Sequence, residues 1–119
     1  MKIFKDFSFE AAHKLPLVPK SHKCSNLHGH SFKVRICVTG IVNELGWVMD
    51  FADLKLICAP VVDSLDHTYL NEIKGLENPT SENISKWLWM HLQYSLKNLE
   101  SIEVMETCNS GCIYMGEES

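Results

Sequence analysis

Hydrophobic and polar residues alternate along several stretches of the chain, which is the pattern of strands that bury one face. In residues 3–13, one face carries Phe7, Phe9, Ala11 and His13. In residues 28–40, one face carries His28, His30, Phe32, Val34, Ile36 and Val38. Residues 101–108 alternate as well, and a short strand over 112–115 follows a turn at 109–111. The pattern therefore predicts four strands, two near each end of the chain.

Between these strand pairs, apolar residues recur every three or four positions, which predicts two helices separated by a loop. The first helix begins near residue 50, and a kink or a break is expected at Pro60. The second begins near Thr80, after Asn78 and Pro79, which offer a cap and a proline start. The order ββααββ predicts an α+β fold with one four-stranded antiparallel sheet and both helices on one face.

Three histidines, His13, His28 and His30, lie on the predicted apolar faces, where an imidazole without a partner is costly. His28 and His30 are two residues apart, so both rings point to the same side of a strand. A metal ion would satisfy all three rings, and three imidazoles with one open position are typical of catalytic zinc. Iron, nickel and copper are alternatives. The competing interpretation is that the histidines are structural.

Cys24 lies in a polar loop beside His22 and Lys23, which favour the thiolate form of the cysteine. We interpret Cys24 as a base or nucleophile; the alternative is a small buried apolar residue. Asp66 and His67 are adjacent, and such a pair either suits acid–base chemistry near neutral pH or simply ends the first helix. Neighbouring residues seldom bond ring to carboxylate directly, so a linear relay with the thiol is not required.

Glu106 occupies an inward position of the strand at 101–108, where a carboxylate needs donors or a cation. A ligand that offers two N–H groups, such as the edge of a guanidine-like heterocycle, would suit it. The alternative is a salt bridge within an oligomer. The densest basic patch of this acidic chain is the loop that carries Lys14, Lys20 and Lys23.

The chain has 119 residues, 45% hydrophobic and 22% charged, which predicts a single domain over residues 1–119. Its net charge of −4 gives no reason to expect binding to nucleic acid or a membrane surface. No apolar run approaches the roughly 20 residues that span a bilayer. The five cysteines are odd in number and no export signal precedes them, so we expect reduced thiols in the cytoplasm.

Six stretches together resemble one known family over essentially the whole chain. They are residues 7–13 (FSFEAAH), 24–30 (CSNLHGH), 46–51 (GWVMDF), 65–67 (LDH), 78–83 (NPTSEN) and 106–107 (ET). On these motifs the chain resembles the 6-pyruvoyltetrahydropterin synthase superfamily, with no departure at a motif position. The gap of three residues between the cysteine and His-Gly-His is similar to the queuosine-pathway branch, the 6-carboxytetrahydropterin synthases. The pyruvoyl-forming animal enzymes have a longer gap.

The resemblance implies the tunnelling fold, in which subunits join through their sheets into trimers and two trimers stack into a homohexamer. It implies a Zn²⁺ ion held by His13, His28 and His30. It also implies that Cys24 accepts a proton, with Asp66 and His67 as its acid–base partners. Active sites of the family lie between subunits, so this pair is expected to meet the thiol across an interface.

The implied reaction converts 7,8-dihydroneopterin triphosphate to 6-carboxy-5,6,7,8-tetrahydropterin, with release of acetaldehyde and triphosphate. Glu106 and Thr107 would hold the pterin ring, and Lys14 and Lys23 would contact the triphosphate. One alternative is a pyruvoyl-forming elimination or a related cleavage of the pterin side chain. An alternative of a different class is a module that binds zinc or pterin without catalysis.

Overall fold

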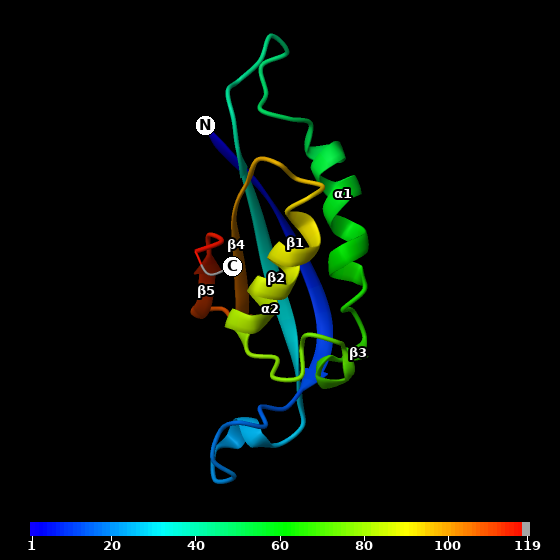
Figure 1. Cartoon of the computed structure of the whole chain (residues 1–119), viewed down its shortest axis with the longest axis vertical. Coiled ribbons are helices and arrows are strands. Elements are labelled where there is room, and N and C mark those ends of the chain that lie inside the picture. Colours follow the sequence, from blue (N-terminus) through cyan, green and yellow to red (C-terminus); the bar gives the residue numbers. More distant parts are fainter. Residues whose placement is uncertain (118–119) are drawn as a thin grey trace.

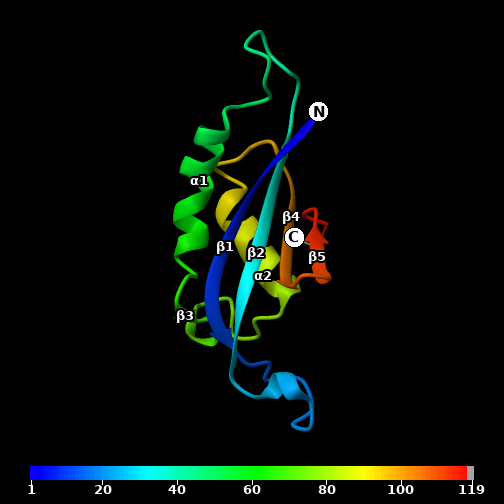
Figure 2. The ribbon, with the colours of Figure 1, turned by 180° about the vertical axis from the view of Figure 1, so that it is seen from behind.

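The computed structural model describes residues 1–117 and arranges them as one sheet with two helices packed on a single face (Figure 1). The sheet order is β3-β1-β2-β4-β5. The strands are β1 (Lys2–His13), β2 (His28–Thr39), β3 (Thr68–Tyr69), β4 (Leu99–Thr107) and β5 (Ser110–Tyr114). The helices are α1 (Phe51–Asp63) and α2 (Ser81–Leu92). The view from behind shows the sheet face that neither helix covers (Figure 2).

The α+β fold with both helices on one face is confirmed, but the prediction of a four-stranded antiparallel sheet is wrong. The sheet has five strands and is mixed, because β3 pairs parallel to β1. In this pairing Thr68 lies opposite Ala11 and Tyr69 lies opposite Ala12. A strand of two residues is too short to show an alternating pattern, so the sequence assigned this segment to a loop.

The two helices begin and end on local signals that the sequence carries in part. Asp50 caps α1 by accepting a hydrogen bond from the backbone N–H of Ala52 at 2.9 Å. The helix does not break at Pro60 but continues for three residues beyond it, to Asp63. The cap of α2 is Thr80, two residues after Asn78, the cap that the sequence predicts.

The hydrophobic core lies between the sheet and the two helices. The aromatic rings of Phe9 on β1 and Phe32 on β2 stack within it, with centroids 4.8 Å apart. From α2 the side chains of Ile84, Leu88 and Leu92 are fully buried against the sheet, as the helical spacing predicts. No helix in residues 1–117 is long and apolar enough to cross a membrane.

The antiparallel register of β1 and β2 decides where the polar end of the core lies. His13 lies opposite His28 and Ala11 lies opposite His30, so the three histidines meet where the β1–β2 ladder ends. The connecting loop, residues 14–27, projects from this end of the molecule, while the loop 40–50 projects from the other (Figure 1). The loop 14–27 contains a short 3₁₀ helix, Lys23–Ser25, which carries Cys24.

Candidate functional site

Three imidazoles converge at the end of the core in a geometry that suits one metal ion. One ligand atom from each of His13, His28 and His30 lies within 4.8 Å of the other two. The strand register produces this cluster, because paired residues of an antiparallel ladder project their side chains to the same face. The structure therefore brings together the three ligands that the sequence predicted.

Hydrogen bonds to backbone carbonyls orient two of these rings. His13 Nδ1 lies 2.7 Å from the carbonyl oxygen of Pro79, and His28 Nδ1 lies 2.6 Å from that of Asn26. A carbonyl can only accept, so Nδ1 carries the proton in each ring and Nε2 keeps its lone pair. Carbonyl partners of this kind fix the ring that a metal binds.

The buried Nε2 atom of His13 has no hydrogen-bond partner among residues 1–117. A buried polar atom without a partner lowers the stability of the folded protein, and a ligand bound to this nitrogen would supply the missing partner. Burial also lowers the pKa of His13, which favours the neutral ring that binds metal. The residues present therefore fit a divalent cation held by three imidazoles, for which zinc is the usual choice.

Glu106 lies beside the histidines and is held by a residue of the second helix. Its Oε1 accepts a hydrogen bond from the hydroxyl of Ser81 at 2.7 Å. Its Oε2 lies 3.7 Å from Nε2 of His30, which is beyond hydrogen-bonding distance. About a quarter of each side chain of Glu106 and His30 is exposed, so a ligand can reach the carboxylate.

A cavity of about 320 Å³ opens beside the histidines and collects most of the predicted site residues. Its lining residues are Lys23, Cys24, His28, His30, Glu106 and Thr107. Cys24 is half-buried, and its backbone N–H donates to His22 Nδ1 at 3.0 Å. Lys14 does not line this cavity; its backbone N–H and carbonyl oxygen bond to the side-chain amide of Asn71. The cavity is large enough for a small heterocyclic ligand.

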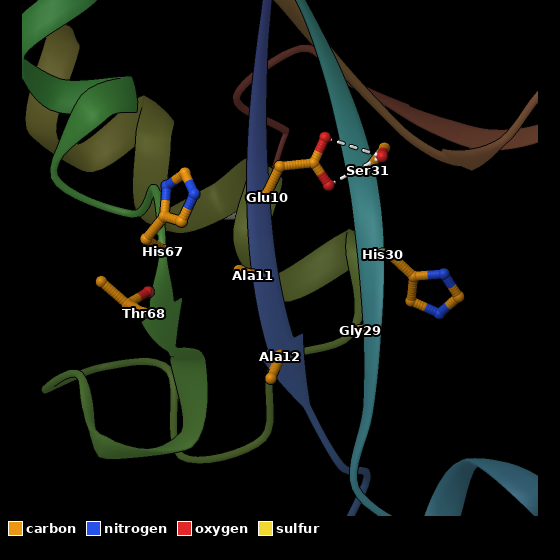
Figure 3. A pocket seen from close by; sticks show the side chains of 8 residues that line it. All are labelled: Glu10, Ala11, Ala12, Gly29, His30, Ser31, His67 and Thr68. Atoms are coloured by element: carbon orange, nitrogen blue, oxygen red, sulfur yellow. Dashed lines mark hydrogen bonds between the residues drawn. The ribbon is translucent and has the colours of Figure 1, made fainter.

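Asp66 and His67 lie apart from this cavity within one chain. His67 borders a second, larger hollow of about 480 Å³. Ala12 and Gly29, which also line it, have little or no side chain. His30 also borders this hollow, and in Figure 3 its ring lies on the far side of strands β1 and β2 from His67. Cys24 does not line this hollow, so the three predicted acid–base residues do not meet in a single copy of the chain.

The Asp66–His67 pair is bonded more directly than the sequence suggested. Asp66 Oδ2 lies 2.9 Å from His67 Nδ1, although adjacent residues seldom pair ring to carboxylate. The backbone makes this possible, because His67 has a positive φ of 56° and its N–H bonds to the carbonyl of Glu10. The N–H of Glu10 donates to Asp66 Oδ1 at 2.8 Å and, with His67, lowers the pKa of Asp66.

Pro79 and Ser81 support the site, and reasoning from residue chemistry did not find them. The pattern of residues 78–83 predicts a helix start, and α2 does begin there. The carbonyl of Pro79 fixes His13, and the hydroxyl of Ser81 holds Glu106. The one sequence signal for a role beyond capping the helix is that residues 78–83 form one of the six motifs that carry the family resemblance.

Comparisons with known proteins agree with this geometry. The sequence profile of the 6-pyruvoyl tetrahydropterin synthase family matches residues 2–117. A Synechocystis relative named 6-carboxy-5,6,7,8-tetrahydropterin synthase is 48% identical and covers 94% of this chain and 91% of its own. A Pyrococcus furiosus relative named dihydroneopterin monophosphate aldolase is 40% identical, over 75% of this chain and 72% of its own. The structure of Caenorhabditis elegans 6-pyruvoyl tetrahydropterin synthase has a TM-score of 0.88 at 27% identity, over 98% and 96% of the two chains.

Proposed function

The chain belongs to the 6-pyruvoyl tetrahydropterin synthase family, and on this basis we propose that it acts as a 6-carboxytetrahydropterin synthase. The reaction takes 7,8-dihydroneopterin triphosphate and water to 6-carboxy-5,6,7,8-tetrahydropterin, acetaldehyde and triphosphate. The 48% identity to the Synechocystis relative of that name supports this choice of product. Within the cell we place the reaction in the cytoplasm, in queuosine and 7-deazapurine biosynthesis; the five free cysteines suit such a reducing setting.

One observation carries the proposal: the thiol of Cys24, the carboxylate of Glu106 and two imidazoles line one cavity, and the two imidazoles converge with the buried ring of His13. The carboxylate of Glu106 can accept two hydrogen bonds from the amino and ring N–H groups of a pterin. A ring held there would direct its side chain toward Cys24 and the histidines.

The residues divide the chemistry among them. When bound by His13, His28 and His30, Zn²⁺ supplies a Lewis acid that polarises substrate oxygens and stabilises negative charge. Cys24, as thiolate, accepts a proton from the side chain of the substrate. Glu106 and Thr107 hold the ring in place while that proton moves.

We place Asp66 and His67 in this reaction through a neighbouring copy of the chain. Their hydrogen-bonded pair is exposed at the edge of the sheet, where His67 has 79% of its side chain accessible. A second copy docked at this edge could present its cavity to the pair, which would then return protons to the substrate. A homohexamer of two stacked trimers would contain such interfaces.

Product identification tests the proposed function. Protein loaded with Zn²⁺ and incubated with dihydroneopterin triphosphate should release acetaldehyde and 6-carboxytetrahydropterin in equal amounts, measured by mass spectrometry. A product that keeps all three side-chain carbons would instead identify a pyruvoyl-forming enzyme. If the protein binds the substrate and the substrate is recovered unchanged, a non-catalytic binding module is the correct interpretation.

Cleavage of a dihydroneopterin side chain by an aldol route is the second candidate. It is favoured by the 40% identity to the Pyrococcus furiosus relative, whose name describes such a reaction on a monophosphate. The two activities differ in the fragment they release from the substrate. Analysis of the small fragment from the same incubation therefore separates them.

Charge reversal at Lys23 is expected to raise the KM for the triphosphate substrate about tenfold, with a smaller effect on kcat. Lys23 lines the cavity beside Cys24, so its ammonium group can contact the triphosphate. The measurement is steady-state kinetics of Lys23→Glu at low ionic strength. Lys55→Glu on the exposed surface of α1 makes the same change in net charge and serves as the control. An equal KM for both variants and the wild type would remove Lys23 from the site.

A further inference from the structure

Two side chains face the carboxylate of Glu106, and only the hydroxyl of Ser81 lies within hydrogen-bonding distance of it. The hydroxyl of Ser81 donates to Oε1 at 2.7 Å, while Nε2 of His30 faces Oε2 at 3.7 Å. The terminal torsion of a glutamate is broad, so the carboxylate would turn toward the imidazole if Oε1 lost its donor. In that position one oxygen would be occupied by His30 and the plane of the carboxylate would be rotated.

We propose that Ser81 is a positioning residue for Glu106 and that it sets the selectivity of the cavity for 2-amino-4-oxo heterocycles. This inference rests on the function proposed above and concerns how the same site distinguishes its ligand from similar heterocycles. An N–H edge with two parallel donors requires both carboxylate oxygens to lie in its plane. The hydroxyl of Ser81 fixes that plane through one oxygen and leaves the second lone pair of Oε1, and all of Oε2, for the ligand.

The position of Ser81 is itself fixed by the start of α2. Thr80 caps the helix by accepting from the N–H of Asn83 at 3.1 Å, which sets the first turn containing Ser81. The preceding residue, Pro79, holds the fully buried His13 through its carbonyl at 2.7 Å. Residues 79–81 therefore contact both the carboxylate of Glu106 and the ring of His13, which keeps these two groups in a fixed relative position.

Two variants of nearly equal shape test the role of the hydroxyl. Ser81→Thr keeps the donor and Ser81→Val removes it, while both add similar bulk at the same position. Loss of a hydrogen bond to a charged group is worth about tenfold or more in binding. We expect zinc-loaded Ser81→Val to bind neopterin about tenfold more weakly than Ser81→Thr, measured by fluorescence titration.

A comparison of two ligands separates positioning from general damage to the cavity. The lumazine analogue of neopterin carries an oxygen in place of the 2-amino group, so it offers Glu106 one donor fewer. Wild-type protein and Ser81→Thr should prefer neopterin to this analogue strongly, and Ser81→Val should lose most of that preference. A purely structural defect would weaken both ligands together and leave the ratio of their affinities unchanged.

The matched control lies one turn further along α2. Ser85 is buried and its hydroxyl donates to the carbonyl of Glu82, so Ser85→Ala removes a hydroxyl from the same helix without touching Glu106. We expect it to leave the ratio of neopterin to analogue affinity at the wild-type value. Zinc content, measured by atomic absorption, should be equal in all variants, because Ser81 is not a ligand.

Equal selectivity of Ser81→Val and Ser81→Thr would overturn the role of Ser81. So would a loss of selectivity in Ser85→Ala as large as that in Ser81→Val. These binding experiments involve no turnover, so they are distinguishable from a failure of the proposed reaction. A wild-type protein that binds neopterin selectively but releases no acetaldehyde would contradict the reaction while the Ser81 comparison is still decided.

Discussion

Removal of the bound metal is expected to lower product formation about a thousandfold, while most of the fold is retained. The reason lies in the three imidazoles, whose ligand atoms lie within 4.8 Å of one another, and in the buried Nε2 of His13, which has no hydrogen-bond partner among the described residues. Lewis-acid stabilisation by a metal is worth several kcal/mol, and about 4 kcal/mol corresponds to this change in rate. The hydrophobic core lies between the sheet and the helices and does not depend on the ion for its packing.

The experiment compares native, chelator-treated and Zn²⁺-reconstituted protein in one product assay. Circular dichroism and sedimentation of the same samples report whether the fold and the oligomer persist. His30→Ala is the matched variant, because His30 is a partly exposed ligand whose removal leaves no large buried cavity. Full activity in protein shown to contain no metal would contradict the assignment of these histidines.

Replacement of Cys24 by alanine is expected to reduce kcat by between a hundredfold and ten-thousandfold, the usual range for loss of a general base. Zinc content should stay at the wild-type level, because Cys24 is not among the three clustered ligands. The thiol belongs to the loop 14–27 rather than to the core, so the free energy of unfolding should change little. The measurement is kcat, with zinc analysis and thermal denaturation on the same preparations.

Cys37→Ala is the matched control for this variant. Cys37 is a half-buried free thiol on β2, in the outer face of the sheet, and it lines neither the cavity nor the hollow described above. Its replacement should leave kcat near the wild-type value. Equal turnover in wild type and Cys24→Ala would remove Cys24 from the mechanism and favour a role in binding alone.

The alternating pattern of the sequence predicted the fold where the strands are long. Ten or more residues of alternation fixed which face of β1 and β2 is buried, and the buried faces of the structure match. The same parity placed the three histidines together, because a one-residue shift would have moved them to opposite faces. The inward position of Glu106 on β4 followed from the same reasoning and is supported by its contact with Ser81.

Very short elements, unusual local backbone conformations and contacts between residues far apart in the chain were not predictable from the alternating pattern. The two residues of β3 carry no periodic signal, and they join the sheet because tertiary packing brings them beside the edge of β1. The direct bond between Asp66 and His67 depends on a left-handed backbone at His67, which a non-glycine residue adopts only in a particular context. The support that Ser81 gives Glu106 joins residues 25 positions apart in the chain.

The sequence by itself determined the strand faces, the helix positions and the set of histidines that share one face, because these depend on periodicities of two and 3.6 residues. The tertiary structure alone decided which residues hold those groups in place. It set the Pro79 carbonyl against His13 and the Ser81 hydroxyl against Glu106, and it kept the Asp66–His67 pair away from Cys24. These contacts depend on how α2 and the loops pack against the sheet, and the local periodicity of the sequence does not determine that packing.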